Sequence, residues 1–153
     1  MFNKKKIKEI LLITFMLLFF SIVKADETFL SLKKNKVNVR YGPGFDFPIK
    51  FIYKKINLPI KQIDSKENWR RIIDLKNNSG WIHRSQLKKI NSIIPLNDKI
   101  LFQKPSIFSK PIALIERGRV LMLKNCSINW CKISSEKFKG WIQASNNWGS
   151  IKK

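Results

Sequence analysis

The chain of 153 residues has few of the residue types that enzymes and metal sites use. It contains one histidine, His83, two cysteines, and ten acidic residues against 31 lysines and arginines. No set of nucleophile, base and orienting group is visible, and no glycine-rich phosphate loop is present. Asp46 and Asp64 stay open as an acid/base couple, although nothing in their spacing singles them out. We therefore predict a protein without enzyme activity, cofactor or metal, since one histidine and two thiols do not make a zinc site.

The long hydrophobic run of the chain lies at the amino terminus, from Ile10 to Val23. Lysines precede it, and it closes on Val23-Lys24-Ala25 with small residues at the spacing of a cleavage site. These three parts predict a secretory signal peptide over residues 1–25. The run is shorter than the about 20 residues that span a bilayer. An uncleaved membrane anchor is the alternative, because Lys24 is an unusual neighbour of a cleavage site. Without a lipobox or sorting signal, export predicts a periplasmic protein.

Acidic residues are scarce, and the chain is strongly basic. Removing residues 1–25, which hold five lysines and one glutamate, lowers the net charge from +21 to +17. Such a charge attracts polyanionic wall material, acidic lipid head groups or nucleic acid. Export argues against nucleic acid, so we expect peptidoglycan or a peptide or protein partner, with weak association with anionic membranes as a further prediction. The alternative is that a composition rich in Lys, Ile and Asn reflects an AT-rich genome and the charge has no function.

The two cysteines, Cys126 and Cys131, lie close together in "NCSINWCKI". In an exported chain an even pair at this spacing predicts a disulfide. Four intervening residues suit a hairpin loop, and closing so small a ring contributes about 2 kcal/mol. A redox pair would instead favour Cys-x-x-Cys at the start of a helix, which the sequence does not show.

The chain after residue 25 contains two copies of one unit. The matched segments are Asn68-Trp69 with Asn129-Trp130, Gly80-Trp81-Ile82 with Gly140-Trp141-Ile142, and "VNVRYGP" from Val37 with "KILFQKP" from Lys99. The offset between the copies stays between 60 and 63 residues, so they differ only by small changes in their loops. The sequence therefore predicts a duplication.

Each copy predicts short strands separated by polar turns, and no stretch has sustained helical periodicity. In the first copy we expect strands around Val37 and Val39 and at 49–54, 58–63, 69–75 and 80–83; in the second, at 112–115, 120–123, 130–133 and 140–142. Five short strands in about 50 residues bury their apolar faces only by curling into a small barrel. Gln62 is polar where the alternation asks for an apolar residue, which indicates a β-bulge.

The segment between the copies, 88–97, is too apolar for a free tether. It contains Ile90, Ile93 and Ile94. Barrels this small bury a modest fraction of their surface. We therefore expect the two barrels to pack against each other.

The motifs that carry a family resemblance are "VNVRYGPG" (37–44), "ENWRRI" (67–72), "GWIHRSQL" (80–87), "NWCKI" (129–133) and "GWI" (140–142). With these motifs the chain resembles tandem bacterial SH3 (SH3b) proteins. The resemblance implies an all-β fold of two tandem small SH3-like barrels after a signal peptide, with envelope targeting or peptide binding and no catalysis. The second copy lacks the Arg-x-Gly-Pro-Gly signature, and Tyr41 stands where the family usually has Ser.

The expected organisation follows from the repeat and the resemblance together. The expected segments are a signal peptide at 1–25, an N-terminal extension at 26–36, a first barrel at 37–90, a linker at 91–97 and a second, degenerate barrel at 98–150. We expect the second barrel to be a structural partner of the first.

The "GPGF" stretch predicts a turn in which Pro43 presets φ and Gly44 adopts a positive φ. This turn would bring the following loop beside the tryptophans of the first copy and form an aromatic and basic cleft. The predicted ligand-binding residues are Arg40, Tyr41, Asp46, Phe47, Trp69, Arg71 and Trp81.

Aromatic walls suit a peptide or a sugar-peptide strand, and guanidinium groups hold carboxylates in two-pronged fashion. The alternatives are that Trp69 and Trp81 plug the ends of the barrel, since both recur in the second copy, and that the arginines are solvated surface charges. An interaction subunit of an exported or membrane-associated complex is the competing function.

Overall fold

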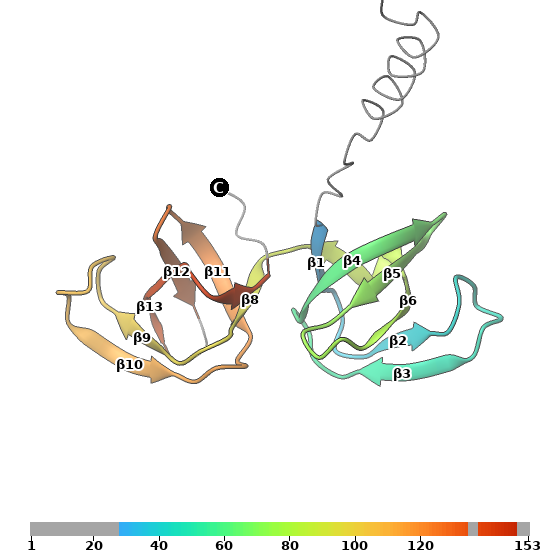
Figure 1. Ribbon diagram of the computed structural model, residues 1–153, viewed down its shortest axis with the longest axis horizontal. Helices are drawn as coiled ribbons and strands as arrows, with labels where there is room; N and C mark the ends of the chain where they lie inside the picture. Colours follow the sequence, from blue (N-terminus) through green and yellow to red (C-terminus); the bar gives the residue numbers. More distant parts are fainter. Residues whose placement is uncertain (1–27, 135–137, 150–153) are drawn as a thin grey trace, which may run out of the picture.

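The computed structural model describes residues 28–134 and 138–149. These residues form two seven-stranded antiparallel sheets, each curled around its own core, and the two lie next to each other along the long axis of the molecule (Figure 1). The prediction of an all-β fold with two small tandem barrels is confirmed. The predicted signal peptide lies outside the described residues. Across the two described ranges, no helix is long and apolar enough to cross a membrane.

The first barrel runs from residue 28 to residue 89. Its strands are β1 (Thr28–Leu32), β2 (Val37–Arg40), β3 (Ile49–Tyr53), β4 (Pro59–Lys66), β5 (Trp69–Ile73), β6 (Ser79–His83) and β7 (Leu87–Lys89), with a 3-10 turn, η1 (Arg84–Gln86), before β7. The sheet order is β3-β2-β6-β5-β4-β1-β7. Alternation places Val37, Val39 and Ile72 in the core, where none of the three is exposed to solvent.

The second barrel repeats this arrangement from residue 92. Its strands are β8 (Ser92–Pro95), β9 (Lys99–Phe102), β10 (Pro111–Ile115), β11 (Leu121–Cys126), β12 (Trp130–Ser134), β13 (Lys139–Gln143) and β14 (Asn147–Trp148). The sheet order is β10-β9-β13-β12-β11-β8-β14. Leu101, Ile133 and Ile142 fill its core, so each barrel encloses a separate cluster of aliphatic side chains.

Two strands lie in segments that the sequence analysis placed outside the barrels. Strand β1 falls within the expected extension, 26–36, and pairs with β4 and β7. Strand β8 falls within the expected linker, 91–97, and pairs with β11 and β14. Both are short strands that extend a sheet and bury apolar side chains, Leu32 in β1 and Ile93 in β8.

The repeated Gly-Trp pair has equivalent surroundings in the two barrels. Trp81 lies opposite Arg40 of β2, and Trp141 lies opposite Phe102 of β9. A Cβ atom at Gly80 would overlap Val39, and one at Gly140 would lie 2.6 Å from the carbonyl oxygen of Phe102. Both glycines are therefore required by the close approach of the neighbouring strand, which confirms the duplication.

Two further details agree with the sequence predictions. The pairing of β4 with β5 shifts register between Gln62 and Asp64, which confirms the β-bulge. Cys126 lies directly opposite Cys131 at the end of the β11–β12 hairpin, and the two form the predicted disulfide. Since Cys131 is fully buried, the disulfide is joined to the core of the second barrel.

The two barrels contact each other through hydrogen bonds and an aromatic pair. Ser92 Oγ donates to the carbonyl oxygen of Asn57 at 2.5 Å, so the 2.9 Å bond between Ser31 Oγ and Ser92 Oγ takes its proton from Ser31. Trp148 Nε1 donates to the carbonyl oxygen of Pro59 at 3.0 Å, and its ring packs edge-on against Phe29. These contacts confirm that the barrels pack together.

Candidate functional site

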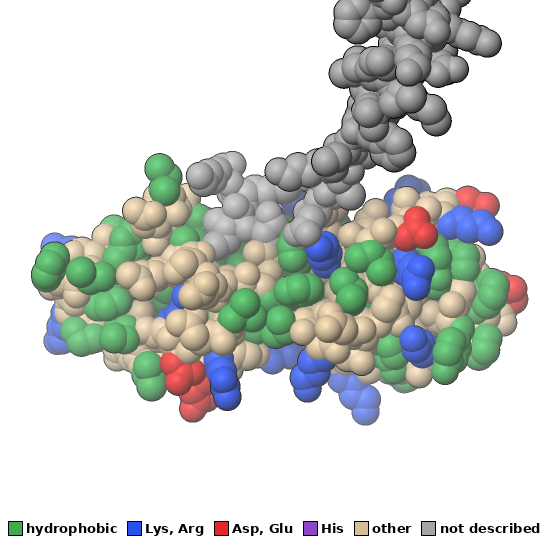
Figure 2. Space-filling view, viewed as in Figure 1, with side chains coloured by type: hydrophobic (Ala, Val, Ile, Leu, Met, Phe, Trp, Pro, Cys, Tyr) green, Lys and Arg blue, Asp and Glu red, His purple; other side chains and the backbone are tan. Residues whose placement is uncertain are grey.

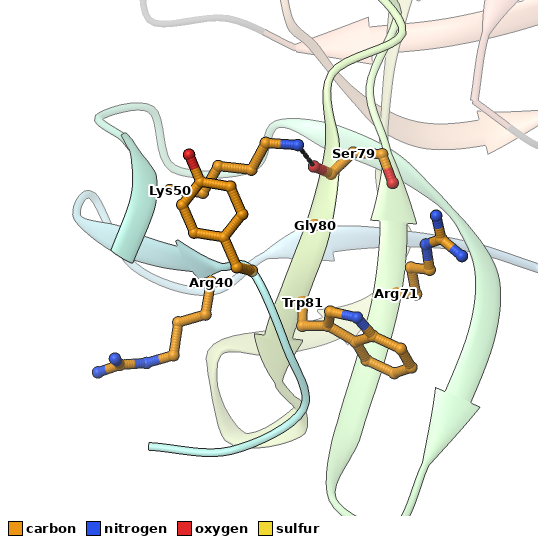
Figure 3. A pocket seen from close by; sticks show the side chains of 7 residues that line it. Arg40, Lys50, Arg71, Ser79, Gly80 and Trp81 are labelled. Carbon is orange, nitrogen blue, oxygen red and sulfur yellow. Dashed lines mark hydrogen bonds between the residues drawn. The ribbon is translucent and has the colours of Figure 1, made fainter. Parts of the chain in front are cut away.

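A cavity of about 320 Å³ opens on the first barrel where β2, β3, β5 and β6 meet (Figure 3). Its lining residues are Arg40, Tyr41, Lys50, Arg71, Ser79, Gly80 and Trp81. The sheet order explains this meeting, because β6 lies between β2 and β5 and Trp81 is opposite both Arg40 and Arg71. Residues more than 30 positions apart in the sequence thus share one wall.

The cavity is lined by three cationic side chains, Arg40, Lys50 and Arg71, and two aromatic ones, Tyr41 and Trp81. Lys50 Nζ donates to the carbonyl oxygen of Ser79 at 2.9 Å and stands 5.6 Å from the centre of the Tyr41 ring. Tyr41 is 62% exposed, Trp81 is half-buried and Arg71 is exposed. Among the described residues, no aspartate or glutamate lines this cavity. The site is therefore suited to a negatively charged or polar ligand with a flat apolar face.

The arginines do not converge on one point. In Figure 3 the guanidinium groups of Arg40 and Arg71 extend in opposite directions on either side of Gly80 and Trp81. Arg40 Nη1 donates to the carbonyl oxygen of Phe47 at 2.6 Å, and its guanidinium carbon lies 5.7 Å from the centre of the Phe45 ring. Arg40 therefore holds the β2–β3 loop, while Arg71 is the exposed guanidinium of the cavity.

A second aromatic group lies beside the cavity. The Phe45 ring packs edge-on against Trp69, with centres 5.0 Å apart, and His83 lies 5.3 Å from Trp69 and 5.4 Å from Phe45. Trp69 is only 7% exposed. It acts as a cover of the core rather than as a wall of the cavity, which is the alternative that its recurrence in the second copy indicates.

The "GPGF" turn differs from the expected one. Among the described residues the glycines with positive φ are Gly118 and Gly149, so the expected positive φ at Gly44 is wrong. The Gly44 N–H donates to the carbonyl oxygen of Gly42 at 3.1 Å, which is the hydrogen bond of a γ-turn with Pro43 at its centre. A Cβ at Gly42 would overlap the ring of Phe47. Glycine is required here because the Phe47 ring packs directly against the backbone of Gly42.

The predicted site residues thus fall into two groups. Arg40, Tyr41, Arg71 and Trp81 line the cavity, whereas Asp46, Phe47 and Trp69 do not. Sequence reasoning missed Lys50 and Ser79. Pairing the predicted strand at 49–54 with the one at Val37 and Val39 as a hairpin would have placed Lys50 near Arg40, since β2 and β3 pair with Arg40 opposite Ile49.

Comparison with protein-family models matches residues 33–89 and 98–149 to a family described as bacterial SH3 domain. No curated protein matches the chain. Among solved structures, the chain is similar to NlpC2 and NlpC1 from Trichomonas vaginalis, at 11% identity in each case and TM-scores of 0.37 and 0.38. The similarity covers 81% and 83% of this chain and 48% and 47% of those proteins, so the chain spans about half of their length.

Proposed function

Because the chain belongs to the bacterial SH3 domain family, we propose that it is a non-catalytic binding module of the cell envelope that recognises peptidoglycan or a peptide through the cavity of the first barrel. The observation that supports this proposal is the composition of the cavity walls. Tyr41 and Trp81 supply aromatic surface, Lys50 and Arg71 supply positive charge, and none of the lining residues is acidic.

The ligand chemistry follows from the free hydrogen-bonding capacity of the two cations. An ammonium group has three donors, and Lys50 Nζ makes one hydrogen bond, to Ser79. The exposed guanidinium of Arg71 offers a planar pair of donors to a carboxylate. Stem peptides of the wall and the ends of protein chains both carry carboxylates, and the rings of Tyr41 and Trp81 suit the flat faces of sugars or peptide bonds.

The proposal assigns no catalytic step to the cavity. His83 is the one imidazole of the chain, and it packs against Phe45 and Trp69 instead of lining the cavity. Its Nδ1 lies 2.8 Å from Ser85 Oγ, a hydroxyl in the exposed η1 turn. The proposed function therefore depends on binding alone.

The proposed location is the periplasm. The Cys126–Cys131 disulfide supports an oxidising compartment, because stable disulfides are rare in the cytosol. The expected signal peptide also supports export from the cytosol. Cell fractionation tests this location. Recovery of all the protein in the cytosolic fraction, with none in the periplasmic extract, would contradict it.

The test of the site is co-sedimentation with purified cell-wall sacculi. Replacing Tyr41 and Trp81 together (Tyr41→Ala, Trp81→Ala) should weaken retention about tenfold or more, equivalent to a loss of about 1.4 kcal/mol. Trp141→Ala is the matched control, because Trp141 occupies the position of Trp81 in the second barrel. It should leave retention unchanged.

Equal sedimentation of the wild type and the double variant would reject the cavity as the site. Recovery of one stoichiometric protein partner from an envelope extract, without retention on sacculi, would select the competing function of an interaction subunit. Thermal unfolding of each variant shows whether a loss of binding reflects a loss of fold.

Weak association with anionic membranes is a second proposal, supported by the β9–β10 loop. Phe108 is 94% exposed and Ile107 is 58% exposed, and Lys104 and Lys110 are exposed on either side of them. Figure 2 shows hydrophobic side chains with Lys and Arg beside them at the end of the molecule formed by the second barrel. Aromatic side chains with flanking cations suit the surface of an acidic bilayer.

This association is tested with vesicles that contain phosphatidylglycerol. Wild-type binding should fall sharply between low and physiological salt, because the attraction is electrostatic and screened. Phe108→Ser should weaken binding further without changing stability, since the side chain is almost fully exposed. Binding that ignores both salt and the substitution would contradict the proposal.

A further inference from the structure

The second barrel has a lysine at a core position where the first barrel has a valine. Val37 begins β2 and lies opposite Tyr53; Lys99 begins β9 and lies opposite Ile115. Val37 is fully buried, and Lys99 is 7% exposed. The position is thus buried in both barrels, but in the second barrel it carries a long side chain whose ammonium group reaches the backbone of Ser145.

This ammonium group has little compensation from the protein. Lys99 Nζ donates to the carbonyl oxygen of Ser145 at 2.6 Å, and within residues 28–134 and 138–149 no carboxylate forms an ion pair with it. Burial lowers the pKa of Lys99, as expected when a charge is removed from water. A buried cation normally has an anionic partner or several acceptors. The Lys99 ammonium group donates one of its three N–H groups to the Ser145 carbonyl, which leaves two donors for a ligand.

Lys99 and Ser145 both line a cavity of about 280 Å³ on the second barrel. Asn97, Gln143 and Asn146 line the same cavity, and each carries a side-chain amide. These amides both donate and accept hydrogen bonds, as a peptide ligand requires. Asp98 also lines it, but this carboxylate is exposed and accepts the backbone N–H of Arg117 at 2.8 Å through Oδ1.

We propose that this second cavity binds a carboxylate group, in particular the terminal carboxylate of a peptide, with Lys99 as its charge partner and the amides of Gln143 and Asn146 as its polar contacts. A single cation beside Asp98 favours a singly charged anion over a doubly charged phosphate. The site lies on the other barrel from the cavity lined by Tyr41 and Trp81 and does not depend on that cavity. The second barrel then has a recognition function of its own.

The experiment is an NMR titration of the ¹⁵N-labelled protein, with both barrels intact, using N-acetylglycine as the probe. N-acetylglycinamide is the neutral control. The side-chain amide signals of Gln143 and Asn146 should shift saturably with N-acetylglycine and not with the amide. The titration midpoint of the Lys99 side chain should rise in the presence of N-acetylglycine, because a bound carboxylate stabilises the ammonium form.

Lys99→Val is the decisive variant, because valine is the natural residue at the matching position of the first barrel. It should abolish the shifts at Gln143 and Asn146 and leave the melting temperature equal to or higher than that of the wild type. Should the Lys99→Val protein not fold, Lys99→Met removes the charge and keeps a long, unbranched side chain. Lys50→Gln, in the first cavity, should leave these shifts unchanged, so that failure of the first-barrel site is read separately.

Two results would overturn the proposal. In the first, the wild type gives no saturable shifts and Lys99→Val melts several degrees lower, which makes Lys99 a structural link to the carbonyl of Ser145. In the second, inorganic phosphate at equal ionic strength gives the same shifts at a lower concentration than N-acetylglycine, which removes the preference for a carboxylate.

Discussion

The two barrels cover equivalent tryptophans in different ways. In the first barrel the ring that packs edge-on against Trp69 is Phe45, which comes from the β2–β3 loop. In the second barrel the ring against Trp130 is Phe102, the last residue of strand β9, with centres 5.6 Å apart. Phe102 stands in the position of Arg40, since each lies opposite the tryptophan of the Gly-Trp pair.

This difference explains why the two loops behave differently. Where the strand carries Arg40, the loop must supply the aromatic cover, and the hydrogen bond from Arg40 to the carbonyl of Phe47 holds it in place. Where the strand carries Phe102, the cover is already present and the loop is free to expose Phe108. The residue at the end of the strand, Arg40 or Phe102, thus accompanies a different arrangement of the next loop, which packs Phe45 on Trp69 in the first barrel and exposes Phe108 in the second.

The largest expected effect tests this difference directly. Phe102 is 9% exposed and Phe45 is 69% exposed. Phe102→Ala should cost the second barrel about 3–5 kcal/mol, the range for a buried phenylalanine, whereas Phe45→Ala should cost the first barrel less than about 1 kcal/mol. Urea unfolding, followed by amide hydrogen exchange in each barrel, measures both. Equal losses would show that the two rings have the same structural role.

An effect of intermediate size is expected when the Cys126–Cys131 disulfide is reduced. The disulfide belongs to the second barrel alone, because both cysteines lie in the β11–β12 hairpin. Adding reductant to the wild type should lower the stability of the second barrel by about 2 kcal/mol and leave the core of the first barrel unchanged. Hydrogen exchange of β12 and β5 with and without reductant gives the two values, and a parallel loss at β5 would mean that the barrels unfold as one unit.

The smallest expected effect is a difference in how the stability of each barrel depends on pH. In the first barrel the cross-strand pair concerned is Val37 and Tyr53. In the first barrel burial, and then the nearby Asp74 carboxylate, raise the pKa of Tyr53, whose hydroxyl donates to Asp74 Oδ2 at 3.0 Å. Above about pH 10 the unfolded chain loses a proton that the folded chain keeps, so the first barrel should lose stability as pH rises. Tyr53→Phe should remove this loss.

In the second barrel the corresponding cross-strand pair is Lys99 and Ile115, and the stability of this barrel should change with pH in the opposite direction. Burial lowers the pKa of Lys99, so between that lowered pKa and about 10.4 the unfolded chain keeps a proton that the folded chain releases. The second barrel should therefore gain stability as pH rises through this window, and Lys99→Val should abolish the gain. Thermal unfolding from pH 7 to 11 with a probe in each barrel measures the slopes, and slopes of equal sign would contradict the comparison.

The sequence predicted most of the fold because alternation and repetition act locally. Strands β2, β6, β12 and β13 alternate buried residues with more exposed ones, and the two Gly-Trp pairs align the copies with each other. The additional strands are harder to predict. β14 has two residues, and β1 buries Ser31, a polar residue whose hydroxyl is hydrogen-bonded to Ser92 of the other barrel.

The candidate site was only partly predictable, because its composition depends on which strands become neighbours. Tyr41, Arg71 and Trp81 follow from the motifs, but Lys50 joins them only through the β2–β3 pairing. Trp69 was also expected to contact the ligand; it is 7% exposed and does not line the cavity. Lys99 aligned with Val37 in the sequence, but a lysine is normally exposed, and its burial became visible only in the folded barrel.

The contacts between the barrels also bear on the distance between two of the proposed contact regions, the first-barrel cavity and the β9–β10 loop. Trp148, bonded to the carbonyl of Pro59, and the linked hydroxyls of Ser31 and Ser92 join the halves near the middle of the molecule, and the β2–β3 and β9–β10 loops lie at its opposite ends (Figure 1). An elongated molecule that binds at both ends, as we propose, would act as a spacer. Under this proposal, substitutions at the contacts between the barrels, such as at Trp148, should change the distance between the two bound partners without changing the affinity for either one.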